Sequence, residues 1–185
     1  MKPRISNVLP LFVALCALAD ASAQDVWRTP RGAIAPEFAS RKSVDGLGVL
    51  VLVTDDPDWG AKWNTPSTTV PNFNEAKTVR TGGSLSILTF VANPKAAARS
   101  GELSVVSHIH LVRPDGSVSV DAPNQPCLRG VLQGPPTNTR LCEAVVGFRA
   151  DPGDQVGKWK VRVTVTDNNR RISVPVETTF TLVAE

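Results

Sequence analysis

Residues 158–166 alternate strictly between polar and apolar side chains, and this pattern constrains the fold more than any other part of the chain. The apolar side chains occupy every second position, namely Trp159, Val161, Val163 and Val165. Successive side chains of a β-strand point to opposite faces of the sheet. The pattern therefore predicts an antiparallel strand with one face in the core and the other in contact with solvent.

The rest of the chain is divided by Gly, Pro, Asn and Asp into short apolar runs, and no long segment has a helical period. The runs predict further strands at residues 46–54, 84–92, 103–113, 117–120, 144–150 and 171–183. About seven strands at this spacing predict an all-β fold, a single antiparallel β-sandwich with Greek-key connections. One short helix is expected near residues 57–63, with Asp56 as its N-cap and Pro57 in its first turn.

The segment Asp154-Gln-Val-Gly157-Lys-Trp159 directly before the alternating strand carries a resemblance to a known architecture. It resembles the corner that leads into the penultimate strand of immunoglobulin-like sandwiches, where a tyrosine usually occupies the place of Trp159. The resemblance implies an immunoglobulin-like or fibronectin III-like sandwich. A shared architecture does not identify a function.

The order of several short motifs also resembles a group of small exported bacterial proteins with such a sandwich. These motifs are Thr-Asp-Asp at 54–56 with a Trp nearby, Phe-Val-Ala-Asn-Pro at 90–94, Arg-Pro-Asp-Gly at 113–116 and the terminal strand. The resemblance implies an exported protein, and it implies no activity.

The first 23 residues have the features of a secretory signal peptide. Lys2 and Arg4 precede an apolar run over residues 8–19, and small side chains at Ala21 and Ala23 occupy the positions that a signal peptidase recognises. Cleavage before Gln24 is expected, which predicts a periplasmic protein. The domain organisation is then a signal peptide (1–23), a polar N-terminal arm (24–43) and a β-sandwich domain (44–185).

Two other membrane topologies are disfavoured by the same segment. A retained transmembrane helix needs roughly 20 apolar residues, and this run ends at Asp20. A lipoprotein would be modified at Cys16, but the preceding Leu15 is larger than the small residue that such sites prefer. Stable membrane insertion is therefore not expected.

Charge gives little indication of a polyanionic partner. Cleavage after residue 23 removes Lys2, Arg4 and Asp20 and lowers the formal net charge from +3 to +2. The basic residues are scattered along the chain rather than gathered in one run, so nucleic acid is not an expected partner.

Cys127 and Cys142 are the cysteines that remain after cleavage, and an exported protein folds in an oxidising compartment. A disulfide between them is predicted. Closing a loop of this size stabilises a folded protein by about 3 kcal/mol. A redox-active or metal-binding pair is the alternative, but the Cys-x-x-Cys spacing and nearby ligands are missing.

The two histidines of the chain, His108 and His110, lie two residues apart in the strand predicted at 103–113. Because the apolar residues of that strand hold the other face, both imidazoles are expected on its polar face. They could hold Zn²⁺ or Cu²⁺ together if a neighbouring strand supplied a third ligand. Two unliganded imidazoles on a polar sheet face are the alternative.

Sequence motifs of the common enzyme classes are missing, so no catalytic residue and no cofactor are predicted. Asp55, Asp56 and Asp58 form the one tight carboxylate cluster. Their spacing is not that of a dedicated calcium loop, and a glycosidase would need two carboxylates that face one another across a sugar site.

Two segments are candidates for contact with a partner protein. Trp59 and Trp63 share a face of the predicted helix, where they could grip an apolar partner or plug one open end of the sandwich. A long loop over residues 124–140, braced by the disulfide, offers four further candidates: Leu128, Arg129, Val131 and Leu132. The loop could also be a passive crossover between strands.

These observations predict a non-catalytic exported module that binds or assembles with another envelope or exported protein. An inhibitor or immunity-type partner is a narrower form of this hypothesis, because braced loops lose little entropy on docking. The alternative is a metal-binding or metal-dependent periplasmic protein centred on His108 and His110.

Overall fold

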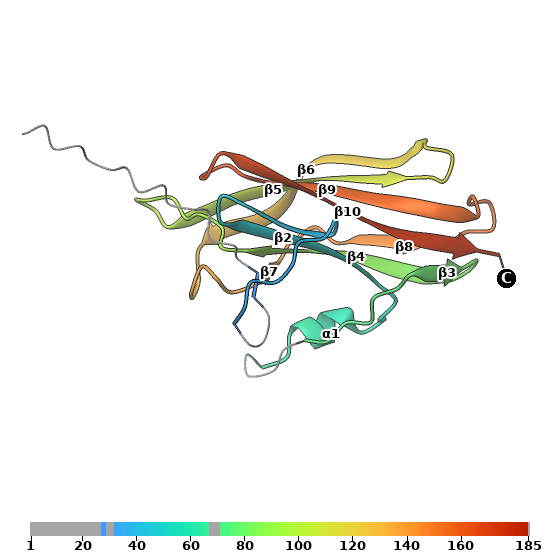
Figure 1. The fold of residues 1–185 in the computed structure, drawn as a ribbon, viewed down its shortest axis with the longest axis horizontal. Helices are drawn as coiled ribbons and strands as arrows, with labels where there is room; N and C mark the ends of the chain where they lie inside the picture. The colour runs from blue at the N-terminus through green and yellow to red at the C-terminus, as the bar shows by residue number, and fades with distance from the viewer. Residues whose placement is uncertain (1–26, 29–31, 67–70, 185) are drawn as a thin grey trace, which may run out of the picture.

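The computed structural model describes residues 27–28, 32–66 and 71–184, which form two five-stranded β-sheets (Figure 1). The first sheet contains β1 (Arg41–Val44), β2 (Leu47–Thr54), β4 (Ser84–Ala92), β7 (Arg140–Leu141) and β8 (Val146–Arg149). The second sheet has the order β3 (Thr78–Arg80), β10 (Ile172–Val183), β9 (Gly157–Asp167), β5 (Glu102–Val112) and β6 (Val118–Val131). Paired strands are antiparallel except β3 and β10. The predicted all-β class is confirmed at this level.

The alternating segment forms β9, and its phase is as predicted. Trp159, Val161, Val163 and Val165 are all buried, whereas the side chains between them lie on the outer face of the second sheet. β10 pairs with β9 through the turn after Asp167, and β5 pairs with the opposite edge of β9. A central strand with one apolar face therefore fixes which side of the second sheet meets the core.

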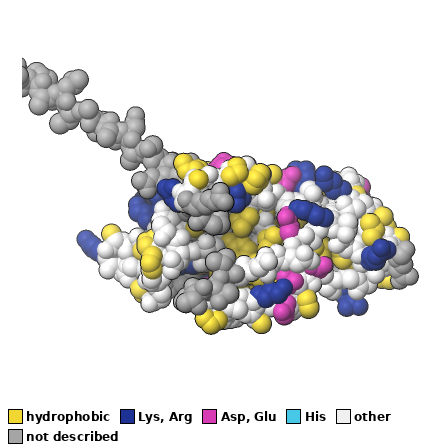
Figure 2. Space-filling model, turned by 60° about the horizontal axis from the view of Figure 1, so that its bottom comes forward, with side chains coloured by type: hydrophobic (Ala, Val, Ile, Leu, Met, Phe, Trp, Pro, Cys, Tyr) yellow, Lys and Arg dark blue, Asp and Glu magenta, His cyan; other side chains and the backbone are white. Residues whose placement is uncertain are grey.

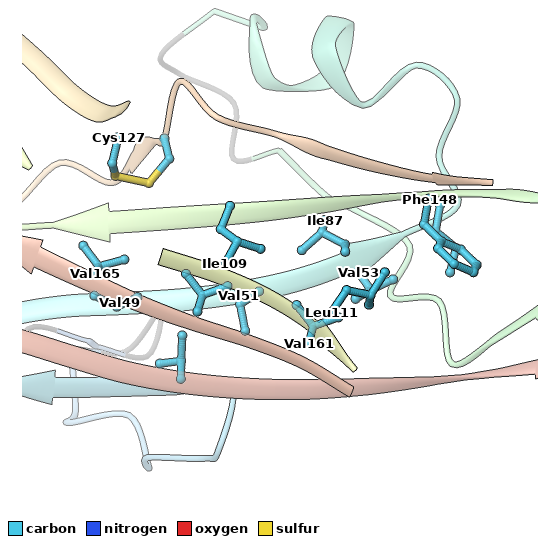
Figure 3. Packing of buried hydrophobic residues seen from close by; sticks show 14 of the residues in the cluster. Val49, Val51, Val53, Ile87, Ile109, Leu111, Cys127, Phe148, Val161 and Val165 are labelled. Carbon is cyan, nitrogen blue, oxygen red and sulfur yellow. A yellow bond between two sulfur atoms is a disulfide. The ribbon is translucent and has the colours of Figure 1, made fainter. Parts of the chain in front are cut away.

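The core lies between the two sheets (Figure 3). Valines of β2 and β9 face one another across the core. Three aromatic side chains, Trp159, Phe148 and Phe180, pack together in one part of the core. In that group the Trp159 ring lies 5.1 Å from Phe148 and 6.2 Å from Phe180, measured between ring centroids. The indole Nε1 donates a hydrogen bond of 2.8 Å to the backbone oxygen of Gln155. Trp159 is thus a core residue, as predicted.

Strand β2 is apolar on both faces because both faces are covered. Its valines enter the core, while Leu50 and Leu52 point to the outer side of the first sheet. On that outer side lies α1 (Trp59–Trp63), the one short helix of the described residues. Trp63 packs on Phe90 of β4 at a centroid distance of 5.3 Å. The helix therefore covers an outer sheet face and does not plug an end of the sandwich.

The start of this helix differs from the prediction. Asp58 occupies the N-cap position and makes no capping hydrogen bond with its side chain. The Asp56 carboxylate instead accepts a hydrogen bond from the backbone N–H of Asn74 and pairs with Lys62 at 2.7 Å. Asp56 therefore anchors the helix to the following segment, which local spacing did not reveal.

Strand β6 is the largest departure from the sequence prediction, which placed a short strand at 117–120 and a loop over 124–140. β6 runs without interruption from Val118 to Val131, so residues 124–131 are strand and the loop is limited to residues 132–139. Pro123, Pro126 and Gly130 suggested a loop, but β6 is an edge strand, where proline is tolerated. Three register shifts against β5 absorb the irregular residues.

The first strand was also missed. β1 takes residues 41–44 from the end of the predicted polar arm and pairs with β2. The two strands are joined by Asp45 and Gly46, both with positive φ, which is the two-residue turn that Asp-Gly favours in hairpins. The Asp-Gly pair was the signal that could have located this hairpin.

The predicted signal peptide, residues 1–23, lies outside the described residues. Within the described part of the chain, helices long and apolar enough to cross a membrane are not found.

Candidate functional site

The predicted disulfide between Cys127 and Cys142 is confirmed. Cys127 belongs to β6 of the second sheet, whereas Cys142 directly follows β7 of the first sheet, so the bond ties the two sheets together at one side of the core. Both cysteines are buried within the core. An inaccessible pair in apolar surroundings is structural rather than redox-active.

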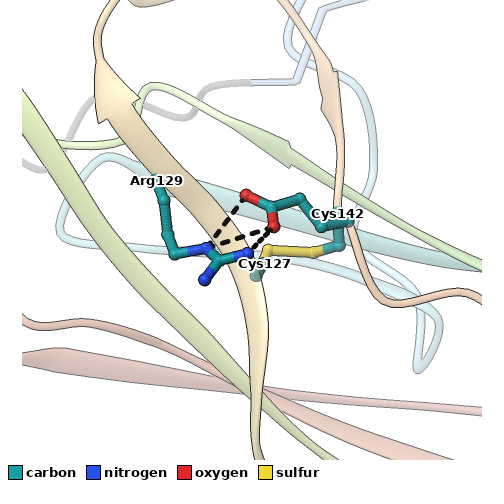
Figure 4. The surroundings of a disulfide bond; sticks show 4 residues. Cys127, Arg129 and Cys142 are labelled. Carbon is teal, nitrogen blue, oxygen red and sulfur yellow. Dashed lines mark hydrogen bonds and ion pairs between the residues drawn. A yellow bond between two sulfur atoms is a disulfide. The ribbon is translucent and has the colours of Figure 1, made fainter.

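The polar side chains beside the disulfide are ordered by an ion pair. Arg129, two residues after Cys127, pairs with Glu143, which follows Cys142, with the Arg129 Nε 3.1 Å from a carboxylate oxygen of Glu143 (Figure 4). The guanidinium hydrogen bond lowers the pKa of Glu143 below its usual value. Glu143 also donates its backbone N–H to the carbonyl of Cys127. This corner of the molecule is therefore held by covalent, ionic and backbone bonds at once.

Four of the six predicted partner-binding residues converge on one groove next to this corner. Trp63, Leu128, Arg129 and Val131 line a groove of about 310 Å³ together with Thr139 and others. Within it Val131 is 55% exposed, whereas Leu128 belongs to the core and is only 8% exposed. Leu128 was predicted in a loop, and its burial follows from its place in β6.

The other two candidates lie outside this groove's lining. Leu132 is half-buried and packs against the core from the start of the loop. Trp59 is half-buried at the start of α1. Trp63 therefore lines the groove and Trp59 does not, and contact of either tryptophan with a partner stays a prediction.

A second hollow adjoins the groove on the outer face of the first sheet. It has a volume of about 250 Å³ and a mostly apolar lining of Trp27, Leu50, Leu52, Trp63, Pro71, Phe73, Phe90 and Thr139. Figure 2 shows hydrophobic side chains gathered at the floor of a hollow near the centre of one face. Trp63 and Thr139 line both hollows. We call the two adjoining hollows the Trp63 surface.

The loop that borders this surface is held by one arginine that sequence reasoning missed. The Arg140 guanidinium donates hydrogen bonds to four backbone carbonyls of the loop, those of Gln133, Pro135, Pro136 and Asn138. Burial lowers the pKa of Arg140 from its usual value. The shape of the loop is therefore held by hydrogen bonds from Arg140.

A different cluster lies on the outer face of the second sheet. His108 and His110 point outward from β5 as predicted, with ring centroids 4.1 Å apart. Asp121 of the neighbouring β6 lies between them, its Oδ1 2.6 Å from Nε2 of His108 and 3.0 Å from Nε2 of His110. The hydrogen bond from His108 lowers the pKa of Asp121 below its usual value. Among the described residues this is the one group of three or more His, Cys, Asp or Glu side chains with ligand atoms this close.

The Asp55, Asp56 and Asp58 cluster has protein partners instead. Asp56 is engaged by Lys62 and by the backbone of Asn74, and the side-chain amide of Asn74 donates to Asp55. Lys62 also lies 3.6 Å from Asp58. These contacts give each of the three carboxylates a partner from the protein itself, so their clustering needs no metal ion.

Comparison with known proteins adds little. No protein-family model matches the chain, and no curated protein matches it. Among solved structures, one described as a family 123 glycoside hydrolase from Clostridium perfringens aligns with 74% of this chain at 10% identity and a TM-score of 0.39. The aligned part covers 28% of that protein's chain. We draw nothing about function from a similarity of this size.

Proposed function

We propose that this chain is a non-catalytic, exported binding or assembly module that engages another envelope or exported protein through the Trp63 surface. The observation that carries the proposal is the shared lining of the two hollows. Trp63 and Thr139 border both, so an apolar hollow and a groove with charged walls form one surface.

The composition of this surface suits protein recognition. Protein interfaces typically have an apolar centre, often with an aromatic anchor, and a polar rim that excludes water. Here Trp63, Phe73 and Phe90 would supply the centre, and the Arg129–Glu143 ion pair would supply part of the rim. An apolar side chain of the partner inserted beside Trp63 would bury surface that the free protein leaves open to water.

Preorganisation supports the same proposal. The disulfide fixes β6 to the segment after β7, and Arg140 fixes the loop between them. A surface that is ordered before docking loses less conformational entropy when it binds. The same rigidity supports a narrower form of the proposal, in which the chain is an inhibitor or immunity-type partner that blocks an envelope enzyme.

We further propose an immunoglobulin-like or fibronectin III-like sandwich with Greek-key connections as the finer architecture. The two-sheet core and the corner before β9 support it, because the Trp159 indole bonds back to the backbone of Gln155 as a corner aromatic does in such folds. Export to the periplasm is part of the proposal too. The signal-like residues 1–23 and the disulfide are compatible with an oxidising compartment.

Affinity capture from envelope extracts tests the function. The protein as exported is immobilised, and its retained partner is identified and then challenged with two variants. Val131→Arg places a charge on the groove, and Arg129→Glu combined with Glu143→Arg reverses the rim charges while it keeps the ion pair. Val131→Arg is expected to lower partner retention by about tenfold or more, because it places a charge in the buried part of the interface. The charge reversal is expected to lower retention less, through slower association.

Val118→Arg is the matched control. Val118 is 53% exposed and begins the same strand that Val131 ends, so it equals Val131 in exposure and secondary structure. Its substitution should leave retention unchanged. Equal retention by the Val131 and Val118 variants would remove the Trp63 surface as the binding site.

A further inference from the structure

We propose that His108, His110 and Asp121 form a binding site for one late first-row divalent transition metal, Cu²⁺ or Zn²⁺. The site is separate from the proposed partner-binding function. It lies on the outer face of the second sheet, whereas the Trp63 surface lies on the first sheet and at the end of β6.

The strand register places the third ligand. The turn at residues 114–116 starts the β5–β6 hairpin with Val112 opposite Val118. Regular pairing from there would put Val120 opposite His110. A register shift between Leu111 and Val112 puts Asp121 there instead. Bulges of this kind re-aim side chains and are common beside functional sites.

The ligand atoms are close to the separation that a metal requires. Zn–N bonds of about 2.0–2.1 Å in a tetrahedral site put ligand atoms about 3.3 Å apart. The Asp121 Oδ1 already lies 2.6 and 3.0 Å from the two imidazole Nε2 atoms, so small side-chain rotations would open the space for an ion. Strands β5 and β6 need not move.

The carboxylate of Asp121 favours a cation at this place. Asp121 brings a negative charge, and the basic side chain of Arg162, opposite His110 on β9, is paired with Glu177 at 2.8 Å. Lys160 also lies 3.3 Å from Glu177. Arg162 and Lys160 share this one carboxylate of β10, which reduces their repulsion of a bound metal without cancelling it.

The donor set indicates the class of metal. Two imidazoles and one carboxylate suit Cu²⁺, Zn²⁺ or Ni²⁺, whereas Mg²⁺ and Ca²⁺ require oxygen ligands. The side chains of His108, His110 and Asp121 are 39%, 35% and 59% exposed. A three-ligand site open to solvent leaves a coordination position for water or for a ligand from another molecule. Copper is expected to bind more tightly than zinc, following the general affinity order of these metals.

Calorimetric titration of the untagged exported protein with CuCl₂ and separately with ZnCl₂ tests the site. We expect one ion per chain. His108→Ala and His110→Ala should each weaken binding by about 100-fold or more, because even indirect partners of metal ligands are worth 10–100-fold. Asp121→Asn keeps the shape and removes the charge, so it should weaken binding as well.

Asp151→Asn is the matched control, because the Asp151 side chain is also exposed, at 69%, and does not belong to the group of His108, His110 and Asp121. The chain has two histidines in all, so the copper electron paramagnetic resonance signal of the wild type must show nitrogen coupling that either histidine substitution reduces. Circular dichroism of the metal-free variants confirms that each is folded. Absence of binding, or binding that the histidine and Asp121 substitutions leave unchanged, would overturn the proposal.

Discussion

Replacement of Trp159 by alanine should destabilise the protein more than any other single truncation of an aromatic side chain in its second sheet. Trp159 is fully buried, and its ring contacts Phe148 of the opposite sheet and Phe180 of the neighbouring strand β10. Large-to-small substitution of a buried aromatic residue costs about 3–5 kcal/mol, the sum of lost transfer free energy and the cavity that remains. The lost hydrogen bond adds little, because Gln155 is exposed and water can replace the indole N–H.

Urea denaturation followed by far-UV circular dichroism measures this cost without reliance on tryptophan fluorescence. The free energy of unfolding should fall by about 3–5 kcal/mol, and in a separate thermal melt the melting temperature should fall by roughly 6–20 °C. Trp59→Ala is the matched control, because Trp59 is only half-buried and lies on the short helix outside the core. It should cost at most about 1 kcal/mol. A Trp159 variant with the midpoint of the wild type would refute the assignment of Trp159 to the core.

Three further perturbations have defined outcomes. Intact mass should rise by two hydrogens on reduction, and joint replacement of Cys127 and Cys142 by alanine should cost about 3 kcal/mol in chemical denaturation, because the bridged residues are 15 apart. Thr89→Val should stabilise the fold by about 1 kcal/mol, since the buried Thr89 hydroxyl has no hydrogen-bond partner among the described residues. The backbone N–H of Ser117 lowers the pKa of Asp115 to about 2. The stability that ionised Asp115 contributes is therefore complete above the usual pKa near 3.8 and disappears as pH falls toward 2. The unfolding free energy of the Asp115→Asn variant should depend less on pH in that window than the unfolding free energy of the wild type.

Local patterns located the strands whose side chains alternate or whose residues are apolar throughout. β4 has the expected bounds, and β9 has the expected phase but extends one residue further at each end, from Gly157 to Asp167. The disulfide followed from the cysteine count. The outward direction of His108 and His110 followed from period-2 geometry alone.

Apart from the β1–β2 hairpin, which the local Asp-Gly pair could have located, the missed features depend on pairing between distant residues. Pro123, Asn124 and Pro126 resemble a loop locally, and only pairing with β5 makes them strand. The two-residue strand β7 exists because β4 offers it an edge. Asp121 could not be assigned to the histidines, because the register shift in β5–β6 decides whether it or Val120 faces His110.

The Trp63 surface was invisible to sequence reasoning for a similar reason. Its lining comes from segments as distant as Trp27 and Glu143, and no local pattern brings them together. The sequence identified the aromatic and apolar residues separately, as candidates for contact with a partner. Their convergence on one surface required the fold.

Site-specific photo-crosslinking in the cell envelope tests the central claim most directly. A photoreactive amino acid is placed at position 131 in one variant and at position 118 in another, two sites of equal exposure at opposite ends of β6. We expect a covalent adduct with one envelope or exported protein from position 131 and none from position 118. Adducts of equal yield from both positions, or from position 118 alone, would contradict the proposal that the chain binds its partner through the Trp63 surface.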